Sequence, residues 1–229
     1  SGHKKTIALA VGLLFVSHPV QTQAVSYIVQ RLASLSTLFY LASLVLYLKG
    51  RLVKGNTFRS SVFFAFSAAA GLMGMLTKEI VFTLPLMVIL IEICFFYEGK
   101  IKEIFKNKIL ILYMIFPLLF TLFIPGLLML KYKAGFITKI FGTIPSQRLE
   151  DPPLSCGIYL ITQFRVIVTY IKLLFVPVNQ NLDYDFPSSQ SFDGATSVGF
   201  VILMLIFISA LWLFQRKRLL SFGILWFFL

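Results

Sequence analysis

The sequence predicts an all-α fold, a polytopic transmembrane helical bundle of about six to seven spans with one amphipathic helix in the outer membrane interface. The first reason is composition, because hydrophobic residues make up 58% of the 229 residues and charged residues only 13%. The second is pattern, since the apolar residues fall in long blocks rather than in the amphipathic periods of a soluble protein. No internal repeat or soluble domain interrupts these blocks. Residues 1–229 are therefore expected to form a single membrane module.

Spans are expected where an apolar block approaches the roughly 20 residues that cross a bilayer core. Six blocks meet this description, and a seventh begins at Leu219: 6–20, 32–48, 61–76, 80–97, 108–130 and 196–214. The first block is short, and Lys4 and Lys5 could extend it by snorkelling to the interface. Pro19 ends it, since proline removes a backbone donor and restricts the residue before it.

The distribution of Lys and Arg predicts the orientation of the bundle. With a cytoplasmic start, thirteen of the 21 Lys and Arg residues lie inside, in 1–5, 49–60, 97–108 and 215–218. This bias follows the positive-inside rule and leaves three outer segments, 18–31, 77–79 and 131–195. The net charge of +12 is then a signal for topology and anionic lipid. It does not indicate nucleic-acid binding, because no soluble segment carries a basic stripe with interleaved aromatics.

The orientation also decides the place of the apolar segment 158–176. The fifth predicted span ends on the outer side, and the sixth ends on the inner side at the basic residues 215–218. The sixth span must therefore start outside, and it could not do so if 158–176 crossed the membrane between them. Its polar residues form one helical stripe, at Thr162, Arg165, Thr169 and Lys172. We therefore expect an interfacial helix whose stripe faces water or a cavity. The alternative is a seventh full span with a polar seam, which would place the acidic residues that follow on the cytoplasmic side.

Polar residues interrupt the apolar chain at two short outer segments. The first begins at His18 and ends with Gln30 and Arg31, at the entrance to the next helix. The second is a tight turn in which Lys78 and Glu79 are neighbours. A cation held this close to the membrane surface can bind a phosphate. Alternatively, Arg31 simply snorkels to the interface, and Lys78 and Glu79 form a surface ion pair worth little.

A third polar stretch belongs to the interfacial helix and the loop after it, from Gln163 to Asp185. Asp183, Tyr184 and Asp185 imitate the DxD metal motif of nucleotide-sugar glycosyltransferases. Those enzymes place the motif on a soluble Rossmann-like sheet, which this chain lacks, so we predict no metal site. The alternative is a polar loop that packs on the membrane surface.

Glu92 lies inside the fourth predicted span. An acid at membrane depth is a functional candidate by default. Because Glu92 is within two turns of the cytoplasmic end, we favour a structural hydrogen bond to a neighbouring helix.

Four stretches resemble the membrane part of bacterial tetratricopeptide-linked glycosyltransferases of the C-type superfamily (GT-C), relatives of the transmembrane and tetratricopeptide-repeat O-mannosyltransferases. They are HPVQTQAVSYIVQR, LASLSTLFYLASLVLYL, MLTKEIVFTLPLMVILIEICFF and YLITQFRVIVTYIKLLFVPVNQNLDYDFP. The resemblance implies an enzyme of the bacterial inner membrane with a periplasmic active face. It also implies transfer of a sugar from a polyprenyl-phosphate donor to a protein or glycan acceptor, with membrane lipid as a partner and no cofactor beyond the lipid-linked donor.

By this resemblance, Arg31 and Lys78, with Arg165 third, would bind the donor phosphate. The residues that would position them, the sugar or the acceptor are His18, Gln30, Glu79, Gln163, Asp183, Tyr184 and Asp185. The acidic catalytic motif of the family lies in its first outer loop, and nothing here matches that loop or the tetratricopeptide repeats. We therefore expect an internal fragment that is inactive alone and whose catalytic residue lies outside it.

Two other functions stay open on the sequence alone. A transporter or flippase for a lipid-linked or anionic substrate would also gather polar residues, although transporter sites usually lie near the midplane, between inverted repeats. A structural membrane anchor for a repeat protein would leave Arg31 and Lys78 freely replaceable.

Overall fold

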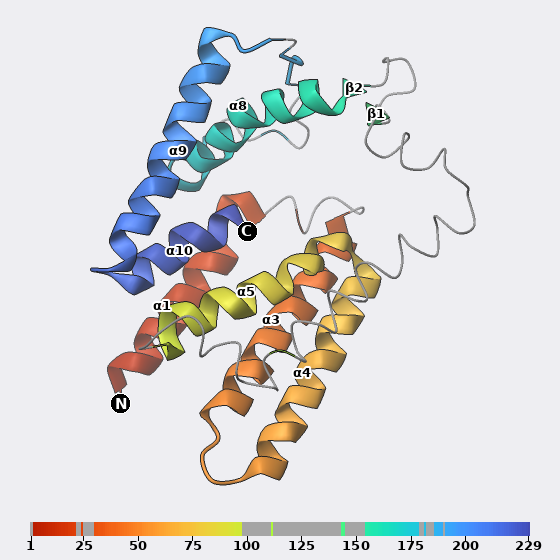
Figure 1. Cartoon of the computed structure of the whole chain (residues 1–229), viewed down its shortest axis with the longest axis vertical. Coiled ribbons are helices and arrows are strands. Elements are labelled where there is room, and N and C mark those ends of the chain that lie inside the picture. The colour runs from red at the N-terminus through yellow and green to blue at the C-terminus, as the bar shows by residue number, and fades with distance from the viewer. Residues whose placement is uncertain are drawn as a thin grey trace, which may run out of the picture.

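The computed structural model describes residues 2–21, 24, 30–97, 111, 143–144, 154–178, 181, 186–189 and 191–229. Its elements are α1 (Gly2–Ser17), η1 (Pro19–Gln21), α3 (Arg31–Leu52), α4 (Thr57–Thr77), η3 (Glu79–Thr83), α5 (Leu84–Ile91), η4 (Glu92–Phe96), β1 (Thr143–Ile144), β2 (Leu154–Ser155), α8 (Cys156–Phe175), α9 (Gly194–Phe214) and α10 (Arg218–Phe228). Figure 1 shows a bundle of helices, to which the two short strands add one antiparallel pair beside the start of α8. The all-α membrane bundle is thereby confirmed.

Five of the described helical segments are long and apolar enough to cross a membrane: Arg31–Leu52, Thr57–Thr77, Glu79–Phe96, Gly157–Phe175 and Gly194–Phe214. The chain is an integral membrane protein. α1 has 16 residues and α10 has 11, so both are shorter than these five. The number of described spans is therefore lower than the predicted six to seven, and the predicted span 108–130 lies outside the described residues.

α3 and α4 form an antiparallel hairpin through small residues. Ser43 and Ser67 face each other, and each hydroxyl donates to the carbonyl oxygen of the other residue, at 2.8 and 2.6 Å. A Cβ added at Gly74 would lie only 3.3 Å from the Cβ of Phe39, so the backbones are close there too. Close approach at small residues and hydroxyl bonds across the seam are common between membrane helices. These contacts fix the register of the hairpin.

The third span, Glu79–Phe96, is a succession of η3, α5 and η4 rather than one continuous α-helix. Pro85 stands in the first turn of α5, where its missing amide hydrogen would have had no helical partner. The span lies across the hairpin (Figure 1), and together they bury one apolar core. The core consists of Leu44, Tyr47, Met75, Val81, Leu84, Met87, Val88 and Ile91. It holds the first three long spans together as one unit.

α9 and α10 form a second hairpin that contacts this unit. Inside the hairpin, the Ser221 hydroxyl donates to the carbonyl oxygen of Ala210 at 2.7 Å. Arg218 at the start of α10 donates from Nη1 to the carbonyl oxygen of Tyr97, at 3.0 Å, just after the third span ends. The N-terminal and C-terminal spans are thus joined at the end where η4 stops.

α8 forms where the interfacial helix is predicted, but its polar stripe does not face water throughout. Thr162 is buried and Arg165 is half-buried, and both contact Ser189 in the segment that leads to α9. This half of the stripe contacts protein, because the segment folds back over α8 and its polar atoms need partners there. α8 runs obliquely to α9 in Figure 1.

Candidate functional site

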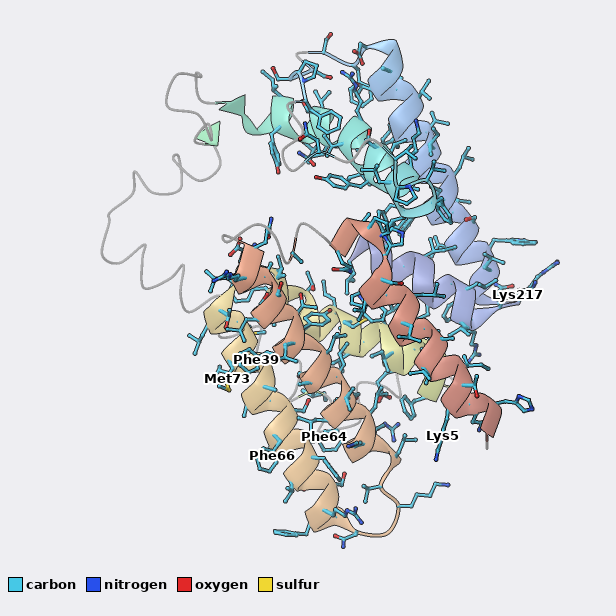
Figure 2. All side chains as sticks on the ribbon, turned by 180° about the vertical axis from the view of Figure 1, so that it is seen from behind. Lys5, Phe39, Phe64, Phe66, Met73 and Lys217 are labelled. Carbon is cyan, nitrogen blue, oxygen red and sulfur yellow. The ribbon has the colours of Figure 1, made fainter. Side chains whose placement is uncertain are left out.

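The hairpin brings two of the predicted phosphate-binding residues to the same end. Arg31 begins α3 and Lys78 follows the last residue of α4. Because Phe39 lies against Gly74, the third turn of α3 is beside the last turn of α4. Figure 2 shows Phe39 and Met73 together near this end, which we call the Lys78 end.

The backbone at the Lys78 end makes a short turn between two spans. Lys78 is extended, with φ −158° and ψ 146°, while its amide still donates to the carbonyl oxygen of Gly74 at 3.0 Å. Its own carbonyl oxygen accepts from the amide of Val81 at 3.3 Å, which starts η3. The turn therefore holds Lys78 and the exposed Glu79 close to the ends of both helices.

Within the described residues, no acidic side chain pairs with the cations at the Lys78 end. Arg31 is exposed and Lys78 is half-buried. Among the residues that the structure describes, neither charged group has a hydrogen-bond or ion-pair partner, and Lys78 does not pair with Glu79. Each of these two cations can therefore bind an anion without first breaking a contact to another described residue. Gln30, half-buried, precedes Arg31 without capping α3 through its side chain.

His18 joins the turn after α1 to the last turn of α8. Its Nδ1 accepts from the amide of Val20 at 3.2 Å, so the proton of the neutral ring is on Nε2. Nε2 lies 3.1 Å from the carbonyl oxygen of Leu174 and donates to it. The imidazole thus holds two distant segments together, and both of its nitrogens are engaged.

Arg165 has partners of its own at the start of α9. Its Nη1 donates to the Ser189 hydroxyl at 3.1 Å and lies 4.0 Å from Oδ2 of Asp193. Asp193 caps α9 by accepting from the amide of Thr196 at 2.8 Å. Hydrogen bonds from the side chain and backbone of Thr196, and to a lesser degree the charge of Arg165, lower the pKa of the Asp193 carboxyl. Arg165 therefore differs from Arg31 and Lys78, because a phosphate would have to compete with protein contacts.

The remaining predicted site residues are Gln163 on α8 and the three residues of the DxD-like stretch. Gln163 is half-buried on α8. Asp183, Tyr184 and Asp185 lie outside the described residues. In the part of the chain that is described, no three His, Cys, Asp or Glu side chains come together as a metal site would require.

Glu92 forms the structural contact favoured from the sequence. It is 4% exposed, and its Oε1 accepts from the Tyr47 hydroxyl at 2.7 Å and from Nε of Arg51 at 2.8 Å. The Arg51 guanidinium also lies over the ring of Phe96, 4.9 Å from its centroid. The predicted hydrogen bond to a neighbouring helix is confirmed. Sequence reasoning missed the partners, although Tyr47 and Arg51 are four residues apart and thus on one face of α3.

The fold and the charges define an integral membrane protein whose first hairpin carries two cations, without a described partner, at one end. No protein-family model and no solved structure matches the chain.

Three vertebrate enzymes are similar to it in sequence. Protein O-mannosyl-transferase tmtc2 of Xenopus laevis is 29% identical over 184 residues, which is 77% of this chain and 21% of that enzyme. Human and mouse protein O-mannosyl-transferase TMTC2 are 35% and 33% identical over 112 residues, which is 47% of this chain and 13% of each enzyme. The chain thus spans about a fifth or less of the length of the relatives it matches.

Proposed function

We propose that this chain is part of a membrane glycosyltransferase that transfers a sugar from a polyprenyl-phosphate donor to a protein or glycan acceptor. Its similarity to enzymes named protein O-mannosyl-transferase supports the reaction class. The observation that carries the site is the pair of cations, Arg31 and Lys78, at one end of the first hairpin without a partner among the described residues. In this proposal the Lys78 end faces the periplasm of a bacterial cell.

The donor phosphate is the leaving group of this reaction, so cations beside it lower the barrier as negative charge develops. Arg31 can hold two phosphate oxygens at once through its planar guanidinium, whereas Lys78 acts as a point charge. Both lie at the end of a predicted span, which in this proposal is the level of a lipid-linked phosphate. Glu79, Gln30 and Gln163 are proposed to position these groups or the sugar. His18 would act indirectly, through the two segments that its ring joins.

The test replaces each cation by glutamine in the full-length protein and measures donor-dependent turnover beside thermal stability in detergent. Loss of one charge-assisted contact, worth roughly 1.5–3 kcal/mol, should lower donor use about ten- to a hundredfold in Arg31→Gln and in Lys78→Gln. Folding should be spared, because neither charged group has a described internal partner. Lys172→Gln, which removes an exposed cation from α8, is the matched control and should keep full turnover.

The conservative variant and the assay separate this proposal from its competitors. Arg31→Lys should recover only part of the loss if the contact is bidentate. Unchanged turnover in both glutamine variants would leave Arg31 and Lys78 as interfacial cations of a membrane anchor. Movement of the donor across the bilayer without release of its sugar would indicate a transporter instead.

A further inference from the structure

We propose that the turn between α3 and α4 binds the phosphate of an anionic phospholipid. The site consists of Lys49, Lys54 and Arg59, which we call the basic turn. It lies at the end of the hairpin opposite the Lys78 end, as Figure 1 shows, and is thus separate from the proposed donor site. The inference does not depend on the proposed function.

Local contacts hold the basic turn in one conformation. Gly55 has φ +76°, a left-handed conformation that other residues rarely adopt, and it reverses the chain sharply. The Asn56 side chain then caps α4 by accepting from the amide of Arg59 at 2.9 Å. The Ser60 hydroxyl donates to the carbonyl oxygen of Gly50 at 2.8 Å, which ties α4 to α3 beside the turn. The backbone that carries the three cations is therefore ordered before any ligand arrives.

The charge of the basic turn is not compensated within the described protein. Residues 49–60 contain four cations and no acidic residue. Glu92 neutralises one of the four, Arg51, and is itself buried by that contact. Lys49, Lys54 and Arg59 are exposed and have no described acidic partner. Together they contribute a charge of +3 that no described acidic residue offsets.

The location of the turn points to a lipid as the source of that anion. The turn connects two spans of 22 and 21 residues, each long enough to cross the hydrocarbon core, so it emerges at the level of the headgroups. The Arg59 guanidinium lies 6.0 Å from the ring centroid of Phe63, which holds this cation beside the apolar surface. Each basic residue at an anionic membrane surface contributes about fivefold in affinity. Three together amount to about a hundredfold.

The experiment titrates short-chain phosphatidylglycerol into the purified full chain in neutral detergent and measures binding by native mass spectrometry. The triple variant Lys49→Gln/Lys54→Gln/Arg59→Gln should lose about a hundredfold in affinity. The matched control, Lys4→Gln/Arg216→Gln/Lys217→Gln, removes equal charge from exposed cations that are predicted on the same side of the membrane. Figure 2 shows Lys217 away from the hairpin, so the control should bind nearly as the parent does.

Three results would overturn the proposal. Equal losses in both triple variants would mean a diffuse attraction to the surface charge rather than a site. Inorganic phosphate that displaces the lipid at similar concentration would identify a site for the free anion. Lys54→Gln alters one exposed side chain in the turn and should lower the affinity for the lipid about fivefold. Unchanged binding in this variant would exclude the basic turn as the site, even if the triple variant failed to fold.

Discussion

A carboxylate at the depth of Glu92 is costly to bury alone, and two residues of α3 offset that cost. The contact is asymmetric, because the side chain of Arg51 is 34% exposed while that of Glu92 is only 6% exposed. Without its partner, Arg51 can still reach water or headgroups at the membrane surface. Glu92 has no such access, so it depends on Arg51 more than Arg51 depends on it.

This asymmetry predicts unequal effects of two similar substitutions. Arg51→Gln leaves a buried carboxylate without its counter-charge and should lower the free energy of unfolding by about 3–5 kcal/mol. Glu92→Gln leaves a partly exposed cation and should cost only about 1–2 kcal/mol. Chemical denaturation in detergent would measure both, with Tyr47→Phe as the control for loss of one hydrogen bond. Equal costs for the two glutamine variants would refute the asymmetry.

At the scale of elements, glycine sets how closely α8 and α9 approach. A Cβ added at Gly199 would lie 2.9 Å from the carbonyl oxygen of Phe164, a backbone atom that cannot rotate away. The rings of Phe164, Phe192 and Phe200 pack around the same place, with centroids 5.2 to 6.1 Å apart. The two helices are thus in backbone contact at a point that α9 reaches only because residue 199 has no side chain.

We expect Gly199→Ala to push α8 and α9 apart and to destabilise the protein by about 1–3 kcal/mol. Gly223→Ala is the matched control, since Gly223 is also helical and nothing lies within 4 Å of the added Cβ. That variant should be neutral or slightly more stable, because alanine favours a helix over glycine. Thermal unfolding in one detergent compares the two. The same loss in both variants would show that helix contact is not the cause.

The elements that could be predicted from the sequence are those set by local composition. The predicted blocks 80–97 and 196–214 correspond to Glu79–Phe96 and Gly194–Phe214, because a long apolar run is a property of the run itself. The division of the third span into η3, α5 and η4 was not predicted, since composition does not distinguish these helix types.

The order of spans and turns along the sequence was enough to predict that Arg31 and Lys78 lie at the same end of the first hairpin. A tight turn before one span and a loop before another bring Lys78 and Arg31 to one end of the hairpin, as the structure has them. The contact of Arg165 with Ser189 depends on how residues 186–189 lie over α8, and no periodicity in the sequence predicts that path. The same holds for the long-range bond from His18 to Leu174.

At the scale of the molecule, two polar contacts join segments far apart in the sequence. His18 reaches Leu174, 156 residues away, and Arg218 reaches Tyr97, 121 residues away. The first contact places the end of α1 beside the end of α8. α8 and α1 therefore end on the same side of the membrane, whether α8 lies in the interface or crosses the bilayer.

This relation makes Cys156, at the start of α8, a reporter of the path of that helix. If α8 lies in the interface, a membrane-impermeant thiol reagent added to intact spheroplasts should label Cys156 and spare the buried Cys94. If α8 crosses the membrane, Cys156 should react only after permeabilisation. Cys156→Ser is the control, and labelling of that variant as strong as in the parent would contradict the predicted orientation.

The reciprocal bonds between Ser43 and Ser67 have a consequence for the entry of the chain into the membrane during synthesis. Because each hydroxyl is satisfied inside the hairpin, α3 and α4 can leave the translocation channel as a pair that needs no later helix for these groups. Glu92 follows on the third span and meets Arg51 already in place. The order of synthesis thus delivers the cation before the acid, so the carboxylate need not wait in the bilayer without its counter-charge.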